Sequence, residues 1–311
     1  MDAILRAAGL VKSYGQVRAV DGVDLEVYPK EIYGLLGPNG SGKTTTLSML
    51  AGVLRPDEGA VKIDAVSVAR SAARLKLGFV PQEIALYPQM TAAENVRFFG
   101  RMQGLHGQRL RERTADALEL VGLGTYANRR VATFSSGMKR RANIAVALVH
   151  SPEVLIMDEP TVGVDPHSRN AILQQLTVLA DAGCGIVFAS HYMEEVQRLC
   201  TRIGIIDAGK IMATGTVAEL MARSAARSRI VLTAAGECEA TLRSLVARLP
   251  EDATCRSDGH EFHIQARQAD ELLGQLLPIA TDAGIAFEGI QLIQPTLEDA
   301  FLEFTGKDLR E

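Results

Sequence analysis

The fold is decided by one stretch of the sequence, Gly37-Pro38-Asn39-Gly40-Ser41-Gly42-Lys43-Thr44. It satisfies the pattern G-x-x-x-x-G-K-[ST], follows the apolar run 32–36 and opens a helical pattern over residues 43–54. The glycines let the backbone wrap closely around phosphate groups, so that successive N–H groups point inward at the start of a helix. We therefore expect a phosphate-binding loop in which Lys43 reaches the β- and γ-phosphates and Thr44 holds Mg²⁺, with Thr45 beside it.

A second motif supplies two adjacent carboxylates, in Val154-Leu155-Ile156-Met157-Asp158-Glu159-Pro160. Its four apolar residues predict a buried strand, and ligands of open α/β sheets bind beyond the carboxyl ends of such strands. Asp158 is placed to hold Mg²⁺, and Glu159 to orient and deprotonate an attacking water. The alternative is a pair of solvated acids at a strand end. Given the phosphate loop upstream, two acids with different tasks favour hydrolysis of a nucleotide.

Around these motifs, short β-rich runs alternate with helical patterns. Residues 23–27 alternate with period 2, whereas 32–36, 154–157 and 186–189 are continuous apolar runs, which suit strands buried on both faces of a mainly parallel sheet. The helical patterns that follow these three runs cover 43–54, 166–182 and 192–200. The large domain is therefore predicted to be an α/β layered domain.

Length and composition bound the remaining possibilities. The chain has 311 residues, a net charge of -4 and 47% hydrophobic residues, which suits two unequal globular domains. No nucleic-acid partner is expected, because phosphate-backbone binding needs clustered excess Lys and Arg. We find neither an apolar run of the roughly 20 residues needed to span a bilayer nor a secretory signal, and so expect a cytoplasmic protein. The four cysteines, at positions 184, 200, 238 and 255, are scattered, which predicts reduced thiols that fill core space.

The composition changes near residues 221–229, where we place the boundary between a domain at 1–222 and a second at 223–311. The first carries 24 basic and 22 acidic side chains, and the second carries 9 and 15. The tail reads as strands at 230–233, 253–256, 261–266 and 285–293, with helices at 239–249 and 269–283 and a short last helix from Thr296. This βαββαβ order predicts a small α+β ferredoxin-like domain, which we expect to support homodimer contacts.

Three further features narrow the class of nucleotide-binding protein. Gln82 ends the run Phe79-Val80-Pro81-Gln82, the stretch Phe134-Ser135-Ser136-Gly137-Met138 precedes an apolar helix, and His191 directly follows the strand predicted at 186–190. Taken together with the two motifs, these resemble the ATP-binding subunit of an ABC transporter, over residues 3–222. Each feature has a plain alternative: Gln82 as a loop amide, His191 as a satisfied histidine at a strand end.

The resemblance implies a fold and roles for individual residues. The fold is a P-loop ABC ATPase with an antiparallel β subdomain and a helical subdomain at about 83–150. Gln82 becomes the Q-loop residue, reaching Mg²⁺, and His191 the switch histidine. Tyr14 matches the aromatic that stacks on adenine, although alone it reads as a core or surface residue. The signature residues Ser135, Ser136 and Gly137, with Asp165 of the D-loop, are implied to contact ATP in a head-to-tail homodimer. In such a dimer each signature helix start, with its unpaired N–H groups, closes on the partner's nucleotide.

The signature departs from the family's Leu-Ser-Gly-Gly-Gln at Phe134, Ser136 and Met138. Phe134 is expected to be a packing change, and Met138 resembles export-type relatives. Ser136 places a Cβ and a hydroxyl where glycine lets the backbone approach phosphate. We therefore expect the closed ATP dimer to be weakened or altered in geometry.

The segments at 85–96 and 295–302 look like the drug-resistance and ABC-2 exporter branch. The resemblance implies an ATPase that energises export through a separate transmembrane permease subunit, at the cytoplasmic face of the membrane. Residues 83–133, which include Val96, Phe98, Phe99 and Met102, are the candidate docking surface for that subunit. The alternative is that these side chains form the core of the helical subdomain.

Three rival classes fit less well. An ABC-type ATPase of DNA maintenance carries a very long coiled coil before the signature, yet only 51 residues separate Gln82 from Phe134. A ribosome-associated ABC factor in translation has two cassettes and a basic linker. A small-molecule kinase explains neither the signature nor His191.

Overall fold

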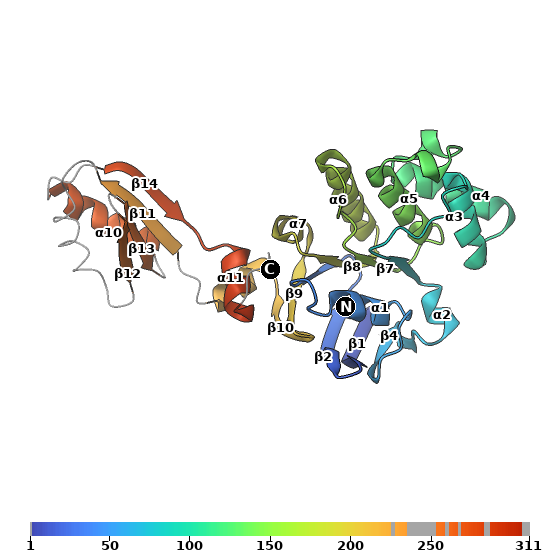
Figure 1. Ribbon diagram of the computed structural model, residues 1–311, viewed down its shortest axis with the longest axis horizontal. Coiled ribbons are helices and arrows are strands. Elements are labelled where there is room, and N and C mark those ends of the chain that lie inside the picture. The colour runs from blue at the N-terminus through green and yellow to red at the C-terminus, as the bar shows by residue number, and fades with distance from the viewer. Residues whose placement is uncertain are drawn as a thin grey trace. The chain divides into compact units, whose positions relative to one another are not determined.

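The computed structural model describes residues 2–224, 228–234, 253–258, 261–266, 269–282 and 287–306. The chain divides into two compact units, one formed chiefly by Met1–Val217 and the other by Ala218–Lys307 (Figure 1). The boundary expected at residue 222 falls within α8 (Val217–Arg223) and remains a prediction. No helix in the described ranges is long and apolar enough to cross a lipid bilayer.

The first unit is built on a six-stranded sheet in the order β10-β9-β3-β8-β7-β6. All neighbours are parallel except β10, which is antiparallel to β9. The central strands β3, β8 and β7 are buried at every residue, which explains their continuous apolar sequences. The strands are β3 (Ile32–Leu36), β6 (Leu77–Val80), β7 (Val154–Asp158), β8 (Gly185–Ser190), β9 (Arg202–Asp207) and β10 (Lys210–Gly215).

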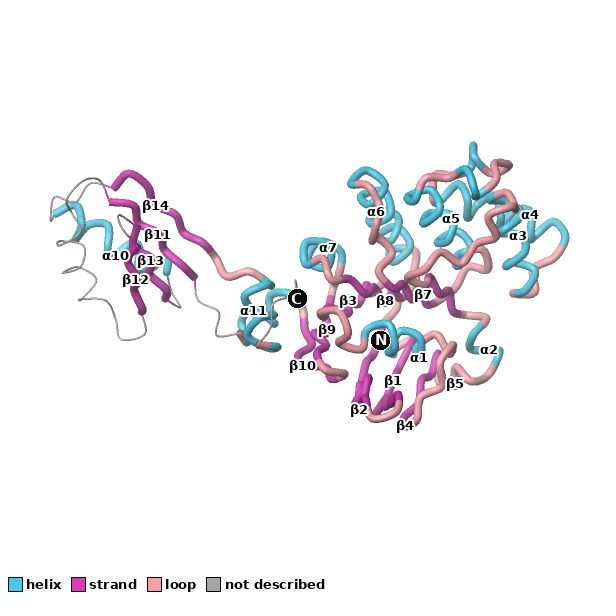
Figure 2. The backbone as a smooth tube through the Cα atoms, in the orientation of Figure 1, coloured by secondary structure: helices cyan, strands magenta, loops and turns pink. Residues whose placement is uncertain are grey.

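An antiparallel sheet, ordered β2-β1-β4-β5, forms the second layer of this unit. Helix α1 (Lys43–Leu50) lies between the two sheets (Figure 2). Leu47 of α1 joins a core that includes Leu5 of the antiparallel sheet and Leu35 of the parallel one. The strands are β1 (Leu5–Tyr14), β2 (Val17–Val27), β4 (Glu58–Ile63) and β5 (Val66–Ser67). The expected antiparallel subdomain is therefore present, and packing on α1 fixes the helix that carries the phosphate loop.

Helix α1 is shorter than the pattern over 43–54 predicted. Its C-cap is Ala51, and Gly52 follows with φ 67°. A glycine in the left-handed region ends a helix readily, because it lacks the Cβ that penalises this conformation. The prediction was too long because apolar residues continue beyond Gly52, and Leu54 packs on the core although it lies outside the helix.

Three helices gather at one end of the parallel sheet and form the helical subdomain: α3 (Ala92–Met102), α4 (Gly107–Leu120) and α5 (Ser136–Leu148) (Figure 1). Helix α3 begins with a capping box in which Thr91 and Glu94 satisfy each other's backbone N–H groups. Val96 is fully buried and belongs to the core, whereas Met102 is 69% exposed. The remaining helices of the unit are α2 (Ser71–Arg74), α6 (Pro166–Asp181) and α7 (Met193–Leu199), with 3₁₀ turns η1 (Gly124–Tyr126) and η2 (Val131–Thr133).

The second unit contains an antiparallel sheet in the order β12-β13-β11-β14. Numbered along the chain this is 2-3-1-4, the order of a ferredoxin-like sandwich, as the βαββαβ pattern predicted. Its core joins Ile230, Phe262 and Leu272. The predicted helix at 239–249 lies outside the described residues. The elements are β11 (Ser228–Ala234), β12 (Thr254–Asp258), β13 (Glu261–Ala266), α10 (Ala269–Asp282), β14 (Phe287–Ile293) and α11 (Leu297–Thr305).

Candidate functional site

The loop between β3 and α1 is held by backbone on both sides. A Cβ on Gly37 would collide with the carbonyl oxygen of Ile206, and a Cβ on Gly42 with that of Ala19. Gly42 has φ 102°, a conformation that only glycine adopts readily. The backbone N–H of Gly209 also donates to the Ser41 carbonyl at 2.9 Å. The two glycines are therefore required by close packing of the loop against neighbouring strands.

The start of α1 suits an anion. Gly42 occupies the N-cap position, no side chain caps the helix, and the first turn has no acidic residue. The first N–H groups of a helix have no intrahelical acceptor, and the helix dipole adds a partial positive charge there. This helix start can therefore accept phosphate oxygens.

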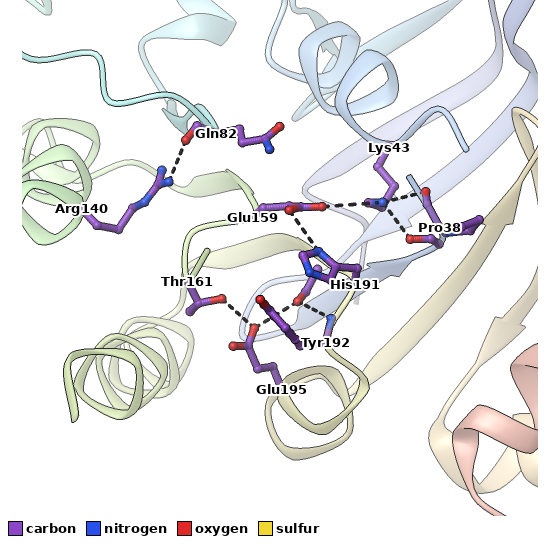
Figure 3. Close-up of polar contacts among 11 residues, drawn as sticks. Pro38, Lys43, Gln82, Arg140, Glu159, Thr161, His191, Tyr192 and Glu195 are labelled. Atoms are coloured by element: carbon purple, nitrogen blue, oxygen red, sulfur yellow. Dashed lines mark hydrogen bonds and ion pairs between the residues drawn. The ribbon is translucent and has the colours of Figure 1, made fainter. Parts of the chain in front are cut away.

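Lys43 points its ammonium group into the loop. Its Nζ donates to the carbonyl oxygens of Gly37 at 2.7 Å and Pro38 at 3.0 Å, and it lies 3.7 Å from Glu159 Oε1 (Figure 3). Burial lowers the pKa of Lys43, while the Glu159 and Asp158 carboxylates oppose that shift. The ammonium is thus placed between the loop carbonyls and the acids at the end of β7.

Asp158 is the last residue of β7 and is 1% exposed. Burial raises the pKa of its carboxyl, and a hydrogen bond with the Thr44 side chain lowers it in part. The second oxygen, Oδ1, is buried without a hydrogen-bond partner. An unpaired carboxylate oxygen beside a threonine hydroxyl is a donor set that suits Mg²⁺, which prefers oxygen ligands. Of the residues expected to hold the metal, Thr44 and Asp158 therefore offer a donor set that fits it.

Glu159 follows in a left-handed conformation, with φ 47°, while its N–H bonds to the Ala189 carbonyl at 3.1 Å. Such a conformation is strained for a residue with a side chain, and strained residues concentrate at functional sites. Its Oε2 lies 3.1 Å from Nδ1 of His191, which stands just after β8. The carboxylate is thus fixed between His191 and Lys43, as Figure 3 shows.

Gln82 is held through its backbone, by a residue that the sequence analysis missed. The Arg140 guanidinium donates to the carbonyl oxygens of Pro81 at 3.0 Å and Gln82 at 2.7 Å. In Figure 3 the Gln82 amide points away from Arg140. Burial lowers the pKa of Arg140, and the charges of Asp158 and Glu159 counteract this. The basic run at 139–141 was the only signal for Arg140, and it reads equally well as a solvated helix start.

The signature residues lie with the D-loop. Ser135 caps α5 by accepting from the Met138 N–H at 3.2 Å, and Ser136 is exposed. A Cβ on Gly137 would lie 2.8 Å from Ser168 Oγ and 3.2 Å from Asp165 Oδ2. Asp165 in turn caps α6 by accepting from the Ser168 N–H at 2.9 Å, a bond that lowers its pKa.

Most of the predicted site residues therefore form two clusters, and Gln82 and Tyr14 belong to neither. One joins the loop 37–44 to Asp158, Glu159 and His191. The other joins Ser135, Ser136 and Gly137 to Asp165. Tyr14 ends β1 and is 53% exposed, which leaves its ring accessible to a ligand. The first cluster can bind phosphate and metal and place a base beside them.

A second missed residue, Glu195 of α7, is 3% exposed. It accepts hydrogen bonds from Thr161, which lies two residues after Glu159, and from Ser190, which directly precedes His191. Burial raises its pKa. Its neighbour Glu194 is exposed, so sequence alone gave no reason to separate the two acids.

Comparison with known proteins gives consistent relatives. The ABC transporter family model matches residues 20–162. The chain is 44% identical to the linearmycin resistance ATP-binding protein LnrL of Bacillus subtilis (strain 168), over 99% of this chain and 100% of that protein. It is 36% identical to the daunorubicin resistance ATP-binding protein DrrA3 of Streptomyces coeruleorubidus, over 99% and 98%. A solved dimeric, post-hydrolysis ATP-binding cassette bound to ADP and Pi matches with TM-score 0.63 and 27% identity, covering 68% of this chain and 98% of that one.

Proposed function

Because the chain belongs to the ATP-binding proteins of the ABC transporter family, we propose that the cluster around Lys43 binds ATP with Mg²⁺ and that Glu159 is the general base. The protein is an ATP-hydrolysing subunit of the type that serves resistance and export. The observation that carries the base assignment is the position of Glu159, held 3.1 Å from His191 and 3.7 Å from Lys43. The two sequence relatives named above are resistance proteins, and neither of them supports a function in DNA maintenance or translation.

The chemistry follows from this geometry. Lys43 and the start of α1 hold the phosphates, and Thr44 and Asp158, with Gln82, would hold Mg²⁺. The metal, when bound, neutralises charge that develops on the phosphate oxygens. Glu159 accepts the proton of the attacking water, while the ring of His191 keeps the carboxylate in place.

The second cluster is proposed to meet a second copy of the chain. The solved relative is a dimer, which supports dimerisation in this family. Here the capped start of α5 presents the exposed residues Ser135 and Ser136 beside Asp165. In a head-to-tail homodimer these groups would close on the γ-phosphate of the partner's ATP.

We assign the docking of a separate membrane subunit to the helical subdomain. Tyr87 and Phe98 are 48% and 36% exposed, and their ring centroids lie 5.1 Å apart. Beside them, a cleft of about 300 Å³ is lined by Phe79, Phe99 and other residues. Exposed aromatic side chains of this kind mark protein interfaces. Val96 takes no part in this surface, because it is buried. Docking there would place the protein at the cytoplasmic face of the membrane.

ATP hydrolysis by the purified protein tests the assignment of the site. Lys43→Ala should weaken binding of ATP by removing the ammonium that faces the phosphates, and release of phosphate should fall with it. Unchanged ATP affinity in this variant would mean that the nucleotide binds elsewhere.

Copurification with the membrane subunit tests the docking surface. Phe98→Glu should reduce recovery of the complex while leaving ATP binding by the isolated protein intact. Ile279→Glu is the matched control, because Ile279 is an apolar residue of the second unit that is 44% exposed, against 36% for Phe98. Equal recovery of both variants would remove the helical subdomain as the docking site.

A further inference from the structure

One buried carboxylate joins the two segments that carry the hydrolytic groups. Glu195 Oε2 accepts from Thr161 Oγ1 at 2.8 Å and from Ser190 Oγ at 3.0 Å (Figure 3). Thr161 stands two residues after Glu159, and Ser190 directly precedes His191. Glu159 and His191, which lie 3.1 Å apart, therefore stand on two segments that Glu195 links by hydrogen bonds.

The Ser190 hydroxyl also holds the backbone that follows His191, at Tyr192. Ser190 Oγ accepts from the N–H of Tyr192 at 3.0 Å while it donates to Glu195. The rings of His191 and Tyr192 have centroids 4.1 Å apart. The orientation of His191 is thus set by Ser190 before it and Tyr192 after it.

A third arm leads from Glu195 to helix α6. Glu195 Oε1 lies 3.4 Å from Arg169 Nε, and the guanidinium of Arg169 lies 4.9 Å from the centroid of the Tyr192 ring. The N–H of Arg169 bonds to the carbonyl of Asp165 at 2.9 Å, one turn earlier. Asp165 borders Gly137 of the signature. Arg169 therefore connects the start of α6 to the carboxylate that bonds to both hydrolytic segments.

We propose that Glu195 is a positioning residue that sets the distance between Glu159 and His191 and couples it to the place of Asp165. The inference rests on the proposed function, because Glu159 and His191 are the groups positioned. A buried carboxylate is weak support for stability, since apolar replacements are often neutral. Its partners Thr161, Ser190 and Arg169 each lie within one helical turn of a site residue along the chain, which fits a role in positioning.

The test uses kinetic variants that keep the shape of the network. Thr161 is fully buried, and Thr161→Val removes its hydroxyl at nearly constant volume. Thr161→Ser restores the donor. Glu195→Gln keeps an oxygen for the two hydroxyls but turns an amide toward Arg169. Glu194→Gln, an exposed acid on the same helix, is the matched control.

We expect kcat of Thr161→Val to fall about 10- to 100-fold, as misplacement by about 1 Å does, with the Kd for a fluorescent ATP analogue unchanged. Thr161→Ser should recover most of the loss. Glu195→Gln should lower kcat less, and Glu194→Gln not at all. Thermal melting of each variant checks that the protein is folded.

Three results would overturn the proposal, and each has a different meaning. If Glu159→Gln abolishes turnover but folded Thr161→Val and Glu195→Gln hydrolyse ATP normally, Glu195 positions nothing and the proposed function stands. If Glu159→Gln itself keeps normal turnover, the base assignment fails and the positioning proposal fails with it. Equal loss of kcat and nucleotide affinity in Thr161→Val would also overturn it, since that indicates general damage to the site.

Discussion

Replacing Glu159 by Gln separates ATP binding from hydrolysis. The amide has nearly the same shape as the carboxylate, so the strained turn at φ 47° and the neighbours Lys43 and His191 can stay in place. Loss of a general base typically costs about 10²- to 10⁴-fold in rate. We expect kcat to fall by that factor.

The same substitution should strengthen ATP binding. A unit-charge pair at 3.7 Å attracts by about 4.5 kcal/mol at an effective dielectric constant of about 20, before the cost of removing Glu159 and Lys43 from water is subtracted. Gln removes that attraction from the nucleotide-free protein and also removes a negative charge from beside the phosphates. Lys43 is then freer to bind them, so the Kd for ATP should decrease.

Two assays check these effects. Phosphate release under saturating ATP measures turnover, and titration with a fluorescent ATP analogue measures affinity. Analytical ultracentrifugation with ATP should show more dimer for Glu159→Gln than for the wild type, because closed dimers are no longer released by hydrolysis. Turnover within about threefold of wild type would refute Glu159 as the base.

The remaining predictions concern the signature, the loop and the thiols. Ser136→Gly should raise ATP-driven dimerisation and the ATPase rate, because in the proposed head-to-tail dimer the exposed Ser136 side chain would stand where the backbone approaches the partner's phosphate; identical values for both proteins would remove that explanation. Gly37→Ala should lower stability by about 1–3 kcal/mol and impair ATP binding, since its Cβ would collide with the Ile206 carbonyl. Gly274→Ala, an exposed position inside α10 with open space around it, should leave ATP binding unchanged and raise stability by at most about 1 kcal/mol; thermal melts distinguish the two variants. Burial raises the pKa of Cys184 from 9.0 to about 12, so at pH 8 the folded protein should hold roughly a thousandfold less Cys184 thiolate than the unfolded chain. Labelling of Cys184 by a thiol reagent should therefore be roughly a thousandfold slower in the folded protein than in urea. Comparable labelling rates with and without urea would show that the structure around Cys184 opens readily.

Much of the fold could be predicted because it depends on local patterns. The β3, β7 and β8 strands are buried on both faces, so each appears as an uninterrupted apolar run. In the tail, strand β13 alternates in burial, and the order of the strands along the chain already limited the topology. The end of α1 was harder to predict, because Gly52 stops the helix while apolar residues continue beyond it.

The sequence by itself determined the loop 37–44 and the adjacent acids Asp158 and Glu159, because their chemistry needs consecutive residues on one turn. Only the tertiary structure decided what surrounds them. Arg140 lies 58 residues from Gln82, and Glu195 lies 34 from Thr161, so no local spacing relates them. Burial gives these residues their roles, since a charge removed from water must find its hydrogen bonds among whatever groups the fold brings near it.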